Sequence, residues 1–213
     1  MQYFGRARRG MVGQLWSVSK YLLILLLLLE STRVNAQTSL VVKSVKGNIQ
    51  GTSTLHDWES EITKITYKGT ARTKGNTIES IRDVEVKVLV EGIKSKEGKV
   101  MDKKTYEAFK ADKNPYIMFS MKTAQVKTGA DKKATIEVTG NLTMAGTTQL
   151  VSLTAESKIL PNNDLQITVS KKIKMTTFNM DSPKAVLGTI HVGDEVTVNF
   201  DIVLTNSNRT TKQ

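Results

Sequence analysis

Apolar residues recur at every second position over long stretches of this chain, and this period of two limits the fold more than any other feature. In residues 84–90 (VEVKVLV), valines alternate with Glu85, Lys87 and Leu89. Successive side chains of a strand point to opposite faces, so this alternation predicts a sheet with one buried face. The same pattern returns in residues 136–144, 151–155, 165–169 and 196–202. The sequence therefore predicts an all-β fold.

Short turn-forming segments separate these predicted strands. Glycine, asparagine, aspartate and proline tolerate tight turns and the left-handed backbone that some turns need. Such residues gather at positions 74–76, 128–131, 145–146, 161–164 and 192–194. Strands at this spacing are typical of an antiparallel barrel or sandwich, and closing the sheet into a barrel removes its exposed edges.

One segment departs from the period of two. Residues 102–110 (DKKTYEAFK) contain good helix formers, with Asp102 as the N-cap and Tyr106 and Phe109 three residues apart. Pro115 follows and cannot continue the pattern. We predict one short helix within a long connection, with both aromatic side chains packed on the barrel.

The N-terminal region has the organisation of a signal peptide. Basic residues precede an apolar run at residues 21–29, which is too short to span a bilayer of about 30 Å. The segment 34–36 (VNA) then places small residues where a signal peptidase reads them. Cleavage after Ala36 leaves Gln37 as the first mature residue, whereas the alternative is an uncleaved anchor. The cleaved form predicts export, to the periplasm first and by secretion as the alternative.

The chain thus divides into a signal peptide (residues 1–36), one barrel domain (37–204) and a polar tail (205–213). The domain is large enough to bury a proper hydrophobic core. The sequence contains no cysteine, which excludes disulfide bonds and thiol chemistry. The net charge of the chain is +11, and +7 remains when the five basic residues and one acid of residues 1–36 are removed. Such a charge is usual for a solvated surface and also favours anionic head groups or membrane surfaces, but no basic helix or arginine cluster indicates nucleic acid.

Three segments resemble the YceI-like family of exported, lipocalin-like proteins. They are residues 51–58 (GTSTLHDW), residues 99–115 followed by 117–119 (IMF), and residues 175–196. Residues 138–146 also resemble the central hairpin of that family, and the resemblance covers nearly all of residues 39–204. It implies an eight-stranded antiparallel barrel around an apolar pore, in which characterised relatives enclose a polyisoprenoid or a similar long amphiphile.

The resemblance also implies a protein that is not an enzyme and needs no cofactor. This chain has Thr177 and Asn179 where the family is expected to have aspartate and glycine, and His191 where lysine is usual. These differences concern one loop of the barrel and leave the expected fold unchanged.

The residues expected to contact a ligand are aromatic or flexible apolar side chains, together with one histidine. They are His56, Trp58, Tyr106, Phe109, Phe119, Leu142, Met144, Met175 and Phe178. Methionine is flexible and polarizable, which suits a pore that encloses an irregular chain. Ordinary core packing is the alternative for each methionine and each aromatic residue. A polar head group would stay near the mouth of the pore, where lysines can pair with a phosphate.

His56, Asp57 and Trp58 allow three interpretations. A histidine beside an aspartate suggests general-base catalysis or a metal, but adjacent strand residues point to opposite faces and the chain has only two histidines. We therefore predict no catalytic residue and no metal site. The second interpretation is a structural corner in which Asp57 accepts backbone hydrogen bonds and Trp58 is packed. The third is a contact from His56 or Trp58 to the ligand.

The sequence predicts an exported barrel that binds a long-chain isoprenoid or another amphipathic lipid for carriage, storage or sequestration. A rival from another class is a structural or interaction barrel whose large interior residues leave no cavity. A lipid-modifying enzyme would need an acid, a base or a nucleophile that converge inside the pore, and no such motif occurs. Transient membrane contact and a homodimer are left open.

Overall fold

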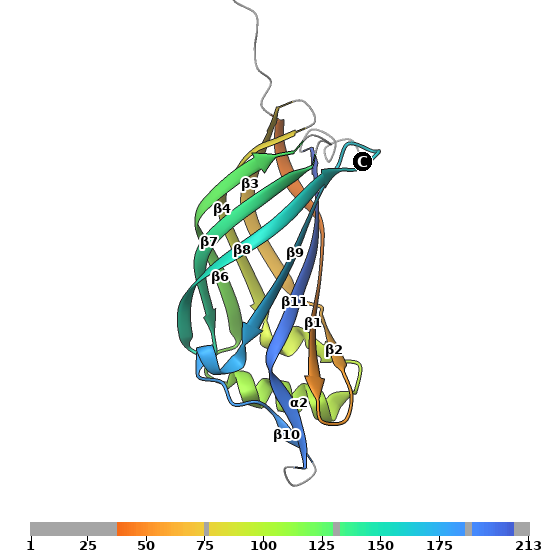
Figure 1. Ribbon diagram of the computed structural model, residues 1–213, viewed down its shortest axis with the longest axis vertical. Coiled ribbons are helices and arrows are strands. Elements are labelled where there is room, and N and C mark those ends of the chain that lie inside the picture. Colours follow the sequence, from red (N-terminus) through yellow and green to blue (C-terminus); the bar gives the residue numbers. More distant parts are fainter. Residues whose placement is uncertain (1–37, 75–76, 130–132, 186–188, 207–213) are drawn as a thin grey trace, which may run out of the picture. The chain divides into compact units, whose positions relative to one another are not determined.

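Eight antiparallel strands close into a barrel in this computed structural model, which describes residues 38–74, 77–129, 133–185 and 189–206. In the order in which they neighbour one another, the strands are β1 (Thr38–Ser53), β3 (Ile65–Lys74), β4 (Thr77–Leu89), β6 (Tyr116–Thr128), β7 (Ala134–Met144), β8 (Thr147–Ile159), β9 (Leu165–Lys174) and β11 (Ile190–Asn206). Pairing of β11 with β1 closes the barrel (Figure 1). The predicted fold class, including the number of strands, is confirmed.

Short elements extend the barrel at one end. They are the strands β2 (Trp58–Ile62), β5 (Ile93–Ser95) and β10 (Lys184–Ala185), the 3-10 helices η2 (Val90–Gly92) and η3 (Met175–Phe178), and the helix α2 (Lys99–Phe109). β2 pairs with β1, β5 pairs with β2, and β10 pairs with β11. Figure 1 shows α2 at the lower end of the barrel, near η3 and the turn that joins β1 to β2.

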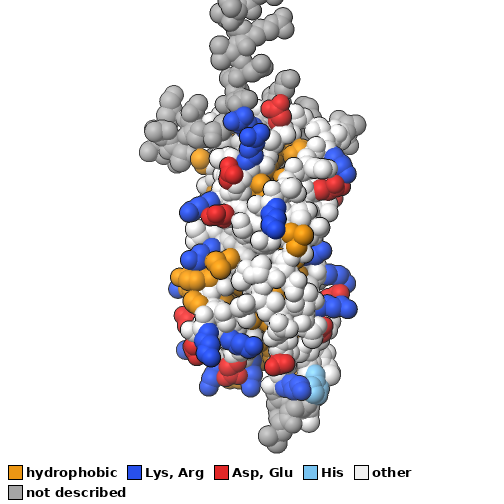
Figure 2. All heavy atoms as spheres, turned by 90° about the vertical axis from the view of Figure 1, so that its left-hand side faces the viewer, with side chains coloured by type: hydrophobic (Ala, Val, Ile, Leu, Met, Phe, Trp, Pro, Cys, Tyr) orange, Lys and Arg blue, Asp and Glu red, His pale blue; other side chains and the backbone are white. Residues whose placement is uncertain are grey.

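The period of two in the sequence becomes the inside and the outside of the barrel. On β7, Ile136, Leu142 and Met144 are buried, whereas Glu137 between them is exposed. Figure 2 shows the resulting outer surface on one side of the barrel, where both signs of charge are scattered and hydrophobic patches are separate. A polar outer face and an apolar inner face are what an antiparallel sheet in water requires.

The buried side chains form two clusters. One surrounds Val90, Ile93 and Phe178 close to α2, and the other surrounds Ile136 and Leu165. Phe200 of β11 packs against both clusters, so it lies where they meet.

The helix begins three residues before the predicted start. Gly98 precedes it with a φ of 90°, a left-handed conformation that glycine adopts without strain, and Lys99 is its first residue. Asp102 therefore lies in the first turn, where its Oδ1 accepts a hydrogen bond from the backbone N–H of Ser95 at 2.7 Å. The predicted N-cap role of Asp102 is wrong, because its carboxylate instead holds the preceding loop.

The turn predicted at residues 192–194 is also wrong. This segment lies inside β11, at a place where the register against β1 shifts between Gly51 and Ser53. A glycine inside a strand pattern marks either a turn or a bulge, and here Gly193 belongs to a bulge. β11 continues to Asn206, while the proposed signal peptide and residues 207–213 lie outside the described residues.

Candidate ligand-binding cavity

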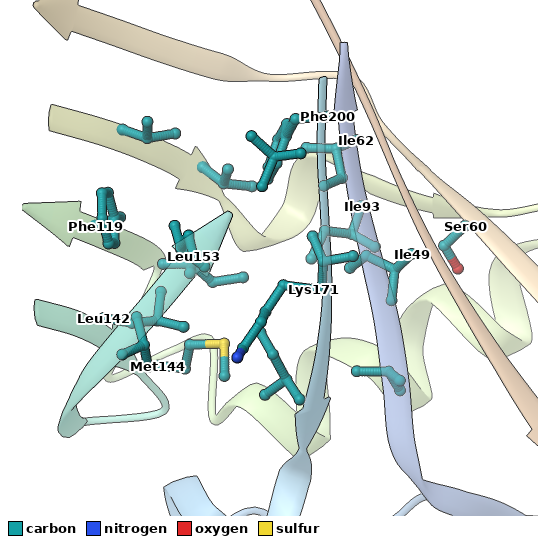
Figure 3. A pocket seen from close by; sticks show the side chains of 18 of the residues that line it. Ile49, Ser60, Ile62, Ile93, Phe119, Leu142, Met144, Leu153, Lys171 and Phe200 are labelled. Carbon is teal, nitrogen blue, oxygen red and sulfur yellow. The ribbon is translucent and has the colours of Figure 1, made fainter. Parts of the chain in front are cut away.

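A cavity of about 220 Å³ lies inside the barrel. One water molecule needs only about 10–15 Å³ by the same kind of measure, so the space is large compared with a packing defect. Inward-facing residues of all eight barrel strands line it, and β2, β5, α2, η3 and the segment after η3 contribute further residues. Figure 3 shows side chains from several strands converging on this space.

The wall is almost wholly apolar because each strand presents every second side chain to it. On β11, Val196, Val198 and Phe200 line the cavity in succession, and β9 contributes Ile167 and Val169 in the same way. Such a surface excludes water and favours the hydrocarbon part of a ligand.

Three aromatic rings of the wall lie over glycines of neighbouring strands. The pairs are Phe119 with Gly140, Trp58 with Gly51, and Phe200 with Gly47. Gly47 is directly opposite Phe200 in the β1–β11 pairing, and a Cβ atom at Gly47 would lie 2.7 Å from Cε1 of that ring. Because the glycines have no side chain, the rings lie against the wall of the barrel.

The structure brings most of the predicted ligand-contacting residues together around the cavity. Those that line it are Trp58, Phe109, Phe119, Leu142, Met144 and Met175. His56 is instead exposed in the turn after β1, with its Nδ1 2.7 Å from the carbonyl oxygen of Asp57. Tyr106 and Phe178 do not line the cavity either. The Tyr106 hydroxyl donates to the carbonyl oxygen of Glu91 at 3.0 Å, and Phe178 is buried in the core. Ligand contact by any of these residues stays a prediction.

Ser53, not Asp57, holds the corner between β1 and β2. Its Oγ accepts hydrogen bonds from the backbone N–H groups of Leu55 and His56 at 3.2 and 3.1 Å, and it donates to the carbonyl oxygen of His56 at 2.7 Å. Asp57 is exposed, and among the described residues its carboxylate has no hydrogen-bond partner. The predicted role of Asp57 is therefore wrong, since a hydroxyl that both accepts and donates suits this turn better than a carboxylate.

Trp58 has the packed position that the structural interpretation predicted. Its ring lies over Gly51, and its Nε1 donates to the carbonyl oxygen of Thr52 at 3.0 Å. The same ring also faces the cavity, so packing and ligand contact do not exclude each other at this residue.

The 3-10 helix η3 is tied to its surroundings by side chains. Asp194 of β11 accepts two hydrogen bonds from Thr176, from the backbone N–H at 2.9 Å and from the hydroxyl at 2.7 Å. These bonds, together with the charge of Lys174, hold the pKa of the Asp194 carboxyl below its ordinary value. Asn179 follows η3 with a φ of 53°, a conformation that asparagine tolerates better than most residues. This explains how asparagine can stand where a glycine was expected.

The cavity contains one charged side chain that the sequence analysis missed. Lys171 of β9 is the only Lys, Arg, Asp or Glu among the described residues that line the cavity. The signal was present in the sequence, because Lys171 occupies the apolar phase of a strand that includes Ile167 and Val169. On β3, burial raises the pKa of the Tyr67 phenol, which also lines the cavity.

Other kinds of site find little support in the described part of the chain. No group of three or more His, Cys, Asp or Glu side chains there is placed to hold a metal ion. None of the helices described is long and apolar enough to cross a membrane.

An eight-stranded antiparallel barrel around an apolar cavity defines a lipocalin-like binding architecture. The model of the YceI-like domain matches residues 30–204, and the chain belongs to that family. None of the curated proteins compared with the chain matches it.

Solved structures with the same fold come from several bacteria. Burkholderia cenocepacia BcnA is 17% identical, with a TM-score of 0.59 over 76% of this chain and 96% of its own. A domain of Saccharophagus degradans described as polyisoprenoid binding is 8% identical, with a TM-score of 0.54 over 79% of this chain and 97% of its own. The YceI protein of Campylobacter jejuni is 20% identical, with a TM-score of 0.50 over 68% and 85%. At these identities the likeness shows the fold alone.

Proposed function

We propose that this protein binds a long-chain apolar or amphipathic molecule of the polyisoprenoid class in its barrel, and carries, stores or sequesters it. The observation that carries this proposal is the apolar cavity lined by all eight strands. Each methylene removed from water contributes about 0.8 kcal/mol, so roughly ten of them supply about 8 kcal/mol before the costs of association. The fold shared with a domain described as polyisoprenoid binding supports the same class of ligand.

Two observations favour this function over its rivals. A barrel with a filled core would have no cavity of about 220 Å³, so a purely structural role is less well supported. Among the described residues that line the cavity there is no carboxylate, histidine or cysteine. A lysine by itself does not make a converging acid, base and nucleophile, so we favour binding over catalysis.

The proposal includes a location outside the cytoplasm and a transient contact with membranes. At the α2 end of the barrel, Leu55 and Val100 are 66% and 74% exposed. Lys99 and Lys103 are exposed on the same helix as Val100, which gives this end both apolar and basic side chains. Such a combination favours an anionic membrane surface from which a lipid can be taken up. A homodimer stays an untested alternative.

Native mass spectrometry of the protein purified from its own host tests the proposed function. The spectrum is expected to show the mature protein with an additional mass of a retained lipid. Leu142→Trp is expected to abolish this retention, because Leu142 lines the cavity from β7. Leu150→Trp is the matched control, because Leu150 is 62% exposed on the neighbouring strand β8.

Far-UV circular dichroism shows whether each variant keeps its β-structure. If Leu142→Trp fails to fold, Leu153→Trp repeats the test from a β8 residue that is less tightly packed and also lines the cavity. A wild-type protein that carries no lipid, or folded cavity variants that retain it as the wild type does, would contradict the proposed function.

A further inference from the structure

Lys171 occupies an inward-facing position of the barrel, and most such positions in this protein are apolar. On β9, the inward-facing residues Ile167, Val169, Lys171 and Ile173 follow one another along the cavity wall. Three of these four side chains are apolar, like most of the cavity wall, whereas Lys171 carries an ammonium group. Figure 3 shows the Lys171 side chain extending into the cavity, with its nitrogen directed toward the side where Leu142 and Met144 lie.

Nothing in the described part of the protein neutralises this cation. Its neighbour Lys172 points outward and pairs with Glu195 at 2.7 Å, but no ion pair or hydrogen bond joins the ammonium group of Lys171 to any described residue. None of the described residues that line the cavity carries a carboxylate either. Placing a charge against an apolar wall without a partner costs free energy, so the lysine is poorly explained by stability.

Lys171 also lies beside an edge of the barrel where two strands separate. Backbone pairing between β8 and β9 runs from Ile159 with Leu165 to Ala155 with Val169, and Lys171 is the next inward residue beyond it. Further along, β8 pairs only with β7, and β9 pairs only with β11. We call this stretch, residues 147–154 of β8 and 170–174 of β9, the unpaired β8–β9 edge.

At the unpaired β8–β9 edge, side-chain hydrogen bonds join β8 to η3 and to the residue that follows it, not to β9. Gln149 Nε2 donates to the carbonyl oxygen of Thr177 in η3 at 3.1 Å, and Asn179 Nδ2 donates to Thr147 Oγ1 at 3.2 Å. A head group at Lys171 would lie next to the stretch where the strands separate, while an attached hydrocarbon chain lies in the apolar lumen.

We propose that Lys171 binds the anionic head group of the ligand inside the barrel, so that the protein selects long-chain amphiphiles that end in a phosphate or a carboxylate. This inference rests on the proposed function, and it places the head group at Lys171 inside the barrel, where the sequence had indicated lysines near the mouth. Lys171 is half-buried, so an ion pair there is screened by salt less than one at the surface and favours charged over neutral heads.

Matched pairs of amphiphiles test the inference by isothermal titration calorimetry below their critical micelle concentrations. The pairs are farnesyl monophosphate with farnesol, and palmitate with 1-hexadecanol. We expect the wild-type protein to bind at least one anionic member about tenfold more tightly than its neutral partner, or about 1.4 kcal/mol. Preference for palmitate alone identifies a carboxylate, and preference for farnesyl monophosphate alone identifies a phosphate. Hexadecylamine is expected to bind more weakly than either palmitate or hexadecanol, because its head repels Lys171.

Variants assign the preference to Lys171. Lys171→Met is expected to weaken binding of the preferred anionic probe about tenfold while leaving the alcohols unchanged, and Lys171→Arg is expected to keep the preference. Lys172→Met is the matched control and is expected to change neither, because Lys172 faces outward.

The outcomes separate the two proposals. If the wild-type protein binds alcohols and anions equally, or if Lys171→Met binds the anionic probes as the wild type does, the role of Lys171 is overturned and the lipid-binding function stands. If none of the probes binds to the wild-type protein, both proposals are overturned. The comparison of anionic and neutral probes uses the wild-type protein alone. It therefore tests the preference for an anionic head group even if a variant misfolds.

Discussion

At the scale of single residues, the cavity depends on glycines, which have no side chain and leave room for aromatic rings against the wall. A large ring in a narrow barrel would ordinarily project toward the axis and fill the lumen. Here Phe119, Trp58 and Phe200 each lie over a glycine of the next strand, so the rings form part of the wall. The glycines therefore keep space open for a ligand while the rings still bury their apolar surface.

We predict that Gly47→Ala destabilises the protein by about 1–3 kcal/mol, the usual cost of overpacking. The new methyl group would lie 2.7 Å from Phe200 Cε1 and 3.2 Å from Ile62 Cδ1, so the ring must move from the wall toward the lumen. Urea unfolding measures the loss. Trp58 is the natural probe, because the other tryptophan, Trp16, lies in the proposed signal peptide.

Two further proteins show whether the ring is the cause. Phe200→Leu combined with Gly47→Ala is expected to cost less than the sum of the single substitutions, because the smaller side chain yields the space that the methyl group needs. Gly129→Ala is the control, since the nearest atom to its Cβ is 3.4 Å away. Equal costs at Gly47 and Gly129, or strict additivity in the double variant, would contradict the explanation.

At the scale of elements, the strands were predictable and their junctions less so. Period two identified β4, β7, β8, β9 and β11, because burial of one face acts on every second residue over the whole strand. The start of α2 and the bulge at Gly193 depend instead on one glycine each, and a glycine signals several structures equally well. The corner at Ser53 could not be told from a corner at Asp57, since both residue types favour turns.

A buried carboxylate joins three elements near the closure of the barrel. Asp164, just before β9, is 2% exposed, and its Oδ2 accepts hydrogen bonds from Lys43 of β1 at 2.8 Å and from Asn162 at 2.9 Å. Burial by itself would raise the pKa of Asp164. The hydrogen bonds from Lys43, Thr205 and Asn162 and the charge of Lys43 outweigh burial, so the pKa lies below its ordinary value.

We predict that Asp164→Asn lowers the free energy of unfolding by about 1–3 kcal/mol at pH 7. Because the pKa of Asp164 is lower in the folded state, the stabilising contribution is present above the unfolded pKa of about 3.9 and is lost as pH falls through the folded pKa. The difference between wild type and variant is therefore expected to shrink below about pH 4. Urea unfolding at pH 7, 5, 4 and 3 measures it.

Asp112→Asn is the control for this pH dependence. Asp112 is exposed and has no hydrogen bond or ion pair within the described residues, so its substitution is expected to have little effect at any pH. A difference between wild type and Asp164→Asn that is the same at pH 7 and pH 3 would show that the carboxylate charge is not what stabilises this junction.

At the scale of the whole molecule, the sequence predicted which apolar residues face the lumen, but it did not predict the charged residue there. Alternation identifies inward residues such as Leu142 and Met144, because the fold makes every inward position similar. It did not identify Lys171, since a single lysine in an apolar phase is easily taken for a strand end or a surface position. Tyr106 was expected at the ligand as an aromatic side chain and His56 as a neighbour of Trp58, but neither lines the cavity.

The arrangement of the chain also bears on export. β1 begins at Thr38, and near its start Leu40 pairs with both Asn206 of β11 and Ala71 of β3. Cleavage after Ala36 would therefore leave the whole of β1, and with it the closure of the barrel, intact. A cleavage site a few residues further along would remove strand residues that pair on both sides.

We predict that the mature protein begins at Gln37 and is recovered with the soluble proteins of the periplasm. The full chain, expressed in a Gram-negative host, is fractionated, and the intact mass of the periplasmic protein gives its first residue. Ala36→Tyr is expected to block cleavage, because the peptidase reads a small residue there, and Asn35→Gln is the control at a position that it does not read. Recovery of uncleaved wild-type protein in washed membranes would instead support an anchor, and the barrel would then take up its ligand while tethered to the membrane.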